Sequence, residues 1–248
     1  PLKSAGNHLP ADFLRVHTPT HSCVGCQVRR QTICAPLTDS QLRDVEANRL
    51  HDQVIARGGH LLHAGEVGGA FFTIKAGWVM LYSLLPDGRR QIHEFALPGS
   101  FIGYEAEGTN PLTYSAEALT DVTACVLPRE GTTRLLRRMP EFALSFACTA
   151  WHSQAHAFQH QSSLGRRNAR ERVAHLLHDQ HSRALLNGLQ DPLALPLTQE
   201  HIGDALGLTP VHVSRTLKTL RDEGIVSTSG HVLEVLDAGR LAEAAVVR

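Results

Sequence analysis

Five cysteines are distributed unevenly along the 248-residue sequence, and three of them lie close together. Cys23, Cys26 and Cys34 share one short segment, whereas Cys125 and Cys148 lie far along the chain. In a reducing compartment such clustering indicates metal or redox chemistry rather than disulfides. Three clustered thiols with Cys125 as a distant fourth form a set that suits either zinc or an iron–sulfur cluster. The spacing alone does not choose between these two, and unligated thiols are the third interpretation.

A second group of possible ligands is a row of histidines. His152, His156 and His160 recur at every fourth position, so they share one face of a predicted helix. That spacing suits a metal site or a pH-sensitive patch, although chance spacing is a strong alternative in a chain with 16 histidines. Cys148 lies on the same helix, where a small packing residue is the simpler interpretation.

An enzyme has to be considered because the predicted β-domain resembles a cupin. A cupin metal site needs a His-x-His pair with a carboxylate and a further histidine, and His60, His63 and His93 do not form that pattern. The sequence offers no nucleophile–base pair and no phosphate-binding loop. The prediction is therefore a protein that is not an enzyme, with a cupin-like metalloenzyme as the alternative from another class.

The C-terminal region has the features of a DNA-reading element. Thr198 is expected to cap one short helix, which ends at Gly207 in a left-handed conformation. Thr209 followed by Pro210 predicts the start of a second helix, which Gly224 ends. Two short helices joined by such a turn predict a helix-turn-helix whose second helix enters the major groove.

The second helix is expected to separate an apolar face from a reading face. Val213, Leu217 and Leu220 face inward, while Arg215 is suited to two hydrogen bonds with guanine. Residues 209–221 are basic and contain no acid, as phosphate contact requires. The residues expected to face DNA are Thr209, Val211, His212, Ser214, Arg215 and Lys218.

Composition bounds the chain only loosely. Its length suits two domains, its formal net charge is +0, and its hydrophobic content is 42%. A neutral chain counts mildly against a nucleic-acid partner, so DNA binding has to rest on the local basic cluster. The sequence has no apolar run long enough for a membrane span and no signal-peptide pattern, so a cytoplasmic location is expected.

The elements that would position these residues predict an α+β protein. Residues 1–36 form an irregular cysteine-bearing segment, and a short helix begins near Leu37 with Thr38 or Asp39 as its cap. Residues 37–138 are assigned to one domain, because short apolar stretches and turn signals about every ten residues predict an antiparallel β-roll or jelly roll. The Pro86-Asp87-Gly88 sequence predicts a hairpin turn.

The C-terminal part of the chain is predicted to be mainly helical. Residues 139–165 form one long helix suited to a subunit interface, and residues 166–248 form the DNA-binding domain, with a wing turning at Ser229-Gly230. The interface residues are expected on one face of the long helix: Phe142, Phe146, Thr149, Ser153 and Ala157.

With these motifs in place, nearly the whole chain resembles the Crp/Fnr family of bacterial regulators. Residues 203–209, Gly-Asp-Ala-Leu-Gly-Leu-Thr, followed by Val213-Ser214-Arg215, look like the family's DNA-binding signature. Residues 99–103, Gly-Ser-Phe-Ile-Gly, look like its β-roll motif. The resemblance implies a β-roll sensor, a long dimerisation helix and a C-terminal winged helix, together with a homodimer that binds palindromic promoter DNA and RNA polymerase.

The resemblance also suggests a signal. Cys23-x2-Cys26-x7-Cys34 with Cys125 is similar to the set that holds an oxygen-labile [4Fe–4S] cluster in the FNR branch, which implies control of dimerisation and promoter binding by oxygen. Cyclic AMP is not expected, because Tyr114-Ser115 stands where cyclic-nucleotide binders carry an arginine before the serine. The alternatives within the same fold are zinc or thiol redox sensing, or another effector such as haem.

One departure concerns the DNA target. FNR-type members usually carry a glutamate where this chain has Val211, which cannot accept a hydrogen bond from cytosine but can contact a thymine methyl. Ser214 and Arg215 match the family. A half-site related to TTGAT is expected, with the position read by Val211 left open.

Overall fold

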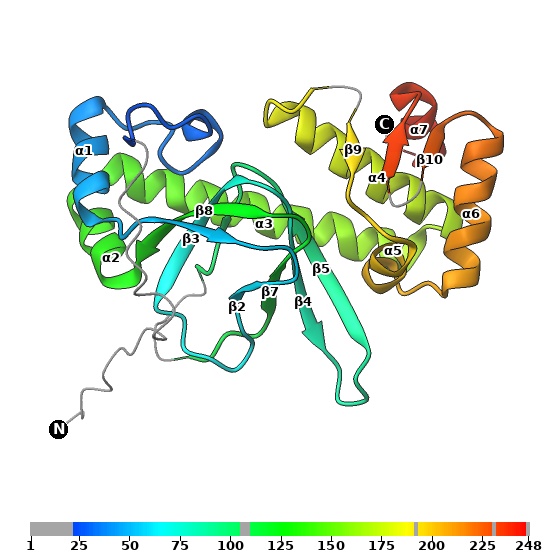
Figure 1. Ribbon diagram of the computed structural model, residues 1–248, viewed down its shortest axis with the longest axis horizontal. Helices are drawn as coiled ribbons and strands as arrows, with labels where there is room; N and C mark the ends of the chain where they lie inside the picture. The colour runs from blue at the N-terminus through cyan, green and yellow to red at the C-terminus, as the bar shows by residue number, and fades with distance from the viewer. Residues whose placement is uncertain (1–21, 105–109, 191–192, 230–231, 247–248) are drawn as a thin grey trace. The chain divides into compact units, whose positions relative to one another are not determined.

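The computed structural model describes residues 22–104, 110–190, 193–229 and 232–246 (Figure 1). The chain divides into two compact units. The first contains residues 1–77 and 98–150, and the second contains residues 78–97 and 151–248. The domain boundaries expected from the sequence stay a prediction.

The first unit is built on antiparallel strands, as the predicted β-roll requires. Its four-stranded sheet has the order β1-β8-β3-β6, with β8 paired to both β1 and β3. Two further strands, β2 and β7, pair with one another. The bounds are β1 Asp52–Ile55, β2 His60–Leu62, β3 Ala70–Ala76, β6 Phe101–Ile102, β7 Ser115–Ala118 and β8 Val122–Pro128.

Two helices lie beside this sheet, and only one of them was expected. Helix α1 (Asp39–Asn48) begins at the predicted cap Thr38, whose hydroxyl accepts a hydrogen bond from the Gln41 N–H. Helix α2 (Arg129–Arg138) follows β8 directly and packs against α1. Its sequence is too polar for an apolar period to reveal it.

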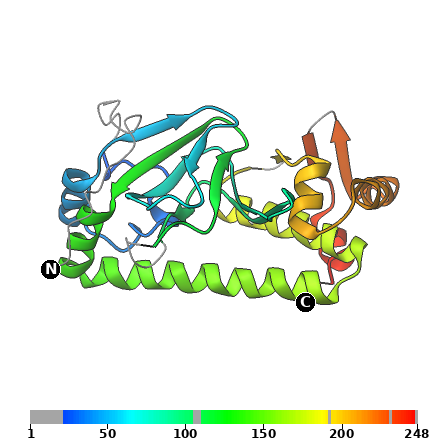
Figure 2. The ribbon, with the colours of Figure 1, turned by 90° about the horizontal axis from the view of Figure 1, so that it is seen from below.

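Helix α3 (Pro140–Arg166) is one continuous helix of 27 residues and passes Gly165, where the sequence suggested an end (Figure 2). Its first turns correct one residue of the expected subunit interface, Phe142, whereas the other residues of that interface stay a prediction. Phe142 is completely buried in the hydrophobic core of the first unit. Phe146 packs edge-on against Phe71 and Phe101, with ring centroids 6.0 and 5.7 Å apart. Both phenylalanines therefore stabilise their own protomer.

The other expected interface positions lie on the same side of α3. Thr149 and Ser153 are half-buried, and only Ala157 is exposed. The sequence showed that this face is apolar but could not show what covers it. A different face of α3 is the exposed one, and it carries Leu144, Cys148, Trp151, Ala155 and Phe158.

The second unit contains a β-hairpin and a helical domain. Strands β4 (Val79–Leu84) and β5 (Arg90–Ala96) pair antiparallel around the predicted Pro86-Asp87-Gly88 turn, where Gly88 has φ of +85°. Asn168 caps α4 (Ala169–Leu186), since its side chain accepts a hydrogen bond from the Glu171 N–H.

The predicted helix-turn-helix and wing are confirmed. Helices α5 (Gln199–Leu206) and α6 (Pro210–Asp222) are followed by β10 (Val226–Ser229) and β11 (Val232–Val235). The expected wing turn includes Gly230, which lies outside the described residues. Strand β9 (Ala194–Leu195) pairs with β11, and α7 (Ala238–Ala244) packs against α4. None of the helices searched in the described residues is long and apolar enough to cross a membrane.

Candidate metal centre and nucleic-acid interface

The four cysteines singled out by spacing line one cavity in the first unit. Cys23, Cys26 and Cys34 reach it from the N-terminal segment, and Cys125 reaches it from β8. Chain segments that are far apart in sequence thus deliver four sulfur atoms to the same place. Cys148 is exposed on α3 and does not line this cavity.

The N-terminal segment is fixed beside α1 by polar and apolar contacts. The Glu46 carboxylate accepts hydrogen bonds from the Cys23 N–H at 2.9 Å and from the Ser22 hydroxyl at 3.0 Å. Ile33 is fully buried in the same core cluster as Cys23 and Phe142. The cysteine segment and the start of α3 therefore share one core.

Cys125 is held by the centre of the sheet. It lies opposite Asp52 on β1 and opposite Thr73 on β3. The guanidinium Nη1 of Arg49 is 3.9 Å from its Sγ atom. Because β8 has hydrogen-bonded neighbours on both sides, Cys125 is the fixed member of the set, and the three N-terminal thiols are brought to it.

Burial dominates the acid–base properties of these thiols. It raises the pKa of Cys23 and of Cys34 to about 12, and their electrostatic interactions with other cysteines of the set add to this. Burial also raises the pKa of Cys125, although the charge of Arg49 opposes that rise. The raised pKa values keep Cys23, Cys34 and Cys125 protonated at neutral pH, and buried thiols of this kind are unreactive.

The donor set fits a thiolate-held metal group in its chemistry and its enclosure. The four sulfurs interact electrostatically and share a cavity whose wall includes Leu42, Val45 and Leu127. As placed, however, no three or more His, Cys, Asp or Glu side chains in the described parts of the chain are arranged to hold a metal ion. Coordination would thus require the thiols to lose their protons and draw together.

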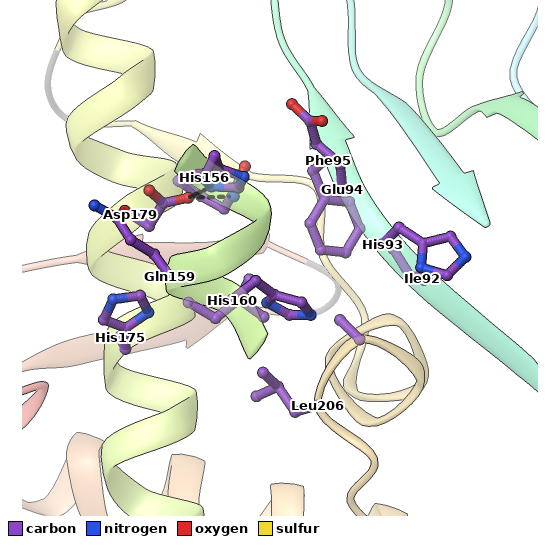
Figure 3. Close-up of a pocket in the computed structure, with 13 residues that line it drawn as sticks. Ile92, His93, Glu94, Phe95, His156, Gln159, His160, His175, Asp179 and Leu206 are labelled. Carbon is purple, nitrogen blue, oxygen red and sulfur yellow. Dashed lines mark hydrogen bonds and ion pairs between the residues drawn. The ribbon is translucent and has the colours of Figure 1, made fainter. Parts of the chain in front are cut away.

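The histidine row belongs to a separate cavity in the second unit, shown in Figure 3. His156 Nε2 lies 3.0 Å from the Asp179 carboxylate, and His160 faces the same cavity with its Nε2 buried and without a hydrogen-bond partner. His175 of α4 also lines it. His152 is exposed and does not line the cavity, so the row of three does not act as one group.

Burial sets the charge of this histidine cavity. It lowers the pKa of both His160 and His175. Burial alone would raise the pKa of Asp179, but the hydrogen bond to His156 and the charge of Arg183 outweigh it and leave that pKa lowered. The cavity is thus expected to hold an ionised carboxylate beside neutral imidazoles at neutral pH.

The helix-turn-helix is built as its capping residues predict. The Thr198 hydroxyl accepts the His201 N–H at 3.1 Å, and Gly207 adopts the left-handed conformation with φ of 63°. At Gly203 an added Cβ would lie 2.8 Å from the Leu208 carbonyl oxygen, which explains the glycine. Thr209 caps α6, with Pro210 at its first position.

The reading face of α6 has the predicted exposure. Val213, Leu217 and Leu220 are buried, whereas Val211 is 58% exposed. The other expected contact residues, Thr209, His212, Ser214, Arg215 and Lys218, are also exposed. A rigid helix therefore presents a single face suited to a DNA groove.

The β4–β5 hairpin supports the first helix of this pair. Arg90 donates from Nε to the Asp204 carboxylate at 2.7 Å and from Nη2 to Glu200 at 3.1 Å. The Gln91 amide donates to the Ala205 carbonyl at 3.2 Å. These contacts fix α5 and thereby the turn that leads into α6.

Sequence reasoning missed the buried charges beside the thiols. Arg49 and Asp52 are buried beside Cys125, Lys75 is partly buried there, and both cations line the thiol cavity. In the sequence they follow a short amphipathic helix or lie in a strand, where charged residues usually indicate solvent exposure. No sequence signal distinguishes them.

Two known protein domain families match parts of the chain. Residues 171–244 match the Crp-like helix-turn-helix domain, and residues 52–139 match the cyclic nucleotide-binding domain. The first contains the complete helix-turn-helix, and the second contains Cys125.

Regulatory proteins match this chain over most of their lengths. The nitrogen fixation regulation protein FixK of Bradyrhizobium diazoefficiens is 34% identical over 224 residues, which cover 89% of this chain and 92% of FixK. The transcriptional activatory protein AadR of Rhodopseudomonas palustris is 34% identical, covering 90% and 95%. The transcriptional activator FnrL of Cereibacter sphaeroides is 29% identical, covering 93% and 94%.

The fold also matches solved structures. FixK2 from Bradyrhizobium japonicum superposes with a TM-score of 0.71 at 30% identity, covering 78% of this chain and 96% of FixK2. A CRP-family transcriptional regulator from Thermus thermophilus gives 0.64 at 26% identity, covering 78% and 96%. The α+β architecture of β-roll, long helix and winged helix is therefore confirmed, and the cupin-like enzyme is set aside.

Proposed function

The chain belongs to the Crp/Fnr family of transcription regulators, and from this premise we propose that it binds promoter DNA as a homodimer under the control of oxygen. In this proposal a [4Fe–4S] cluster is held by Cys23, Cys26, Cys34 and Cys125. The observation that carries it is the cavity lined by all four thiols. When bound, the cluster supplies a redox-active and oxygen-sensitive group.

The chain's own residues suggest how the site communicates with α3. Cys23 and Ile33 belong to the same core cluster as Phe142. Holding the cysteine segment against Cys125 would therefore favour one packing of the start of α3, and releasing the segment would favour others. This is a population shift between two states of the protomer.

Thiol oxidation is a weaker explanation of the same cysteines. Redox-sensing cysteines are usually exposed and have lowered pKa values. Here burial raises the pKa of Cys23 and Cys34 to about 12. Thiols of this kind suit a metal group, whose positive charge would replace the bound protons.

The exposed face of α3 supports the homodimer. Leu144, Trp151 and Phe158 are 67%, 72% and 57% exposed, which is unusual for large apolar side chains. With Cys148 and Ala155 they alternate at spacings of four and three residues, the pattern of two helices packed side by side. We assign the dimer interface to this face.

The DNA target follows from α6. Arg215 is expected to bind guanine through two hydrogen bonds, and Val211 to contact a thymine methyl where relatives with glutamate accept from cytosine. Ser214 and Lys218 complete the contacts with bases or phosphates. The expected half-site is related to TTGAT, and binding of RNA polymerase at the promoter remains part of the proposal.

The experiment is an anaerobic purification followed by controlled exposure to air. We expect a coloured protein containing iron and sulfide, whose affinity for a palindromic promoter fragment falls after air exposure. Cys26→Ser should remove the colour, whereas Cys148→Ser, which changes an exposed thiol outside the cavity, should retain it. Fluorescence anisotropy with labelled DNA measures the affinity at a fixed salt concentration.

Three outcomes contradict parts of the proposal separately. A colourless protein that contains zinc and binds DNA equally in air would refute oxygen sensing. Loss of colour in Cys148→Ser but not in Cys26→Ser would refute the ligand set. Arg215→Ala should weaken specific binding by about 1–3 kcal/mol, and unchanged affinity would refute the reading helix.

A further inference from the structure

Three charged side chains form a buried network directly behind Cys125. Arg49 Nη1 lies 2.8 Å from one oxygen of Asp52, and Lys75 Nζ lies 2.7 Å from the other. Their side chains are only 2%, 6% and 14% exposed, for Arg49, Asp52 and Lys75 respectively. Of these three groups two are cationic and one is anionic, and the less buried carboxylate of Glu46 also interacts electrostatically with Arg49.

The fold brings the two cations of this network close to the thiols. Arg49 ends α1, and its Nη1 is 3.9 Å from the Cys125 sulfur. Asp52 pairs with Cys125 across β1 and β8, and Lys75 comes from the neighbouring strand β3. Both cations line the cavity that contains the four cysteines. On the other side, the carboxylate of Glu46 is occupied by hydrogen bonds from Ser22 and Cys23.

A buried charge costs free energy unless a counter-charge or a strong hydrogen-bond acceptor accompanies it. Cys125 offers Arg49 only a weak acceptor while its thiol is protonated, because a neutral thiol accepts a hydrogen bond weakly. A four-thiolate metal group supplies a negative charge at the same place, since the negative charge of its ligands exceeds the positive charge of its core. The network is therefore electrostatically complementary to the deprotonated, metal-loaded site.

We propose that Arg49, held in place by Asp52, is a positioning residue that stabilises the four-thiolate site and raises the reduction potential of its cluster. This inference rests on the iron–sulfur function proposed above. A nearby positive charge stabilises the reduced state, which carries more negative charge, and hydrogen bonding to a ligand sulfur acts in the same direction. Lys75 contributes charge from the opposite side of Asp52.

The test is a series of variants that changes the buried charge in both directions. Arg49→Gln lowers the net charge of the network by one, Asp52→Asn raises it by one, and Arg49→Lys leaves it unchanged. We expect the reduction potential of the anaerobically purified, cluster-loaded protein to fall in Arg49→Gln and to rise in Asp52→Asn. Arg49→Lys should lie closest to the wild type. Arg30→Gln, which removes an exposed charge from the cysteine segment, is the control and should change the potential least.

The two opposite shifts separate an electrostatic role from a structural one. If the network only supported the fold, Arg49→Gln and Asp52→Asn would both lose iron and sulfide without ordered changes in potential, and the proposal would be overturned. If Arg49→Gln fails to retain the cluster while Arg49→Lys retains it, a requirement for the positive charge is supported. The wild type distinguishes the two proposals: a zinc-containing wild type refutes the cluster, whereas a loaded wild type with unchanged potentials in the variants refutes the role of Arg49.

Discussion

Replacing Trp151 with glutamate should abolish the dimer while leaving the protomer folded. Trp151 is 72% exposed on α3, so its side chain contributes little to the stability of its own protomer. In a side-by-side helix pair the same side chain would be covered by the partner. A glutamate there would lose that apolar contact and place two carboxylates near one another across the interface.

The magnitude follows from the exposed area. For a side chain of roughly 250 Å², 72% exposure corresponds to roughly 180 Å² available to a partner. At about 25 cal/mol per Å², complete burial contributes at most about 4.5 kcal/mol per protomer. If burial of Trp151 contributes half of that limit in each of the two protomers, its loss increases the Kd of the dimer roughly a thousandfold.

Sedimentation velocity over a concentration series measures that Kd, and circular dichroism verifies that the fold is retained. Leu186→Glu is the matched control, because Leu186 is 81% exposed and lies on α4 rather than on α3. We expect the control to dimerise like the wild type. An unchanged Kd in Trp151→Glu would refute the assignment of this face, and a loss of helical signal would mean that Trp151 supports the protomer instead.

Four further predictions address single features. Phe142→Ala should cost about 3–5 kcal/mol in urea unfolding, because Phe142 is fully buried. Gly77→Ala should lower the free energy of unfolding by about 3 kcal/mol, more than Gly88→Ala does. Both glycines have φ near +85°, but only the Cβ added at residue 77 would clash with backbone. Burial lowers the pKa of His160 below its ordinary 6.5. As the pH drops below that value, the unfolded chain is protonated before the folded protein, and the free energy of unfolding therefore falls. His160→Gln should flatten this fall as the pH drops below about 6.5. Val211→Glu should shift base preference from thymine towards cytosine at one position of each half-site, measured by competition between labelled operators.

Features determined by local sequence were the predictable ones. Thr38, Thr198 and Thr209 act as caps, and Gly207 ends α5, because capping depends on a few neighbouring residues. The cysteine spacing likewise grouped Cys23, Cys26 and Cys34, and the resemblance to the FNR branch added Cys125, which lines the same cavity. Short-range chemistry was thus sufficient for the helix-turn-helix and for three of the four candidate ligands.

Features determined by long-range packing could not be predicted from the sequence. The period of α3 identified one helix face, but it could not show that Phe142 is buried in its own protomer or that Phe146 packs partly against the same core. Arg49 is an ordinary residue at the end of a helix until β1, β3 and β8 surround it. Both cases depend on segments that are distant in the sequence, which a single chain without its fold does not reveal.

The position of Cys125 in the centre of the sheet has a consequence for chain entropy. Any group that joins Cys34 to Cys125 closes a loop of roughly 90 residues, because the two ligands lie on either side of almost the entire β-region. By analogy with a disulfide, closing a loop of this size restricts the unfolded chain by an amount worth about 4–5 kcal/mol. The bound group would then act as a cross-link as well as a sensor. Its loss would remove the restriction on the unfolded chain across the entire β-region.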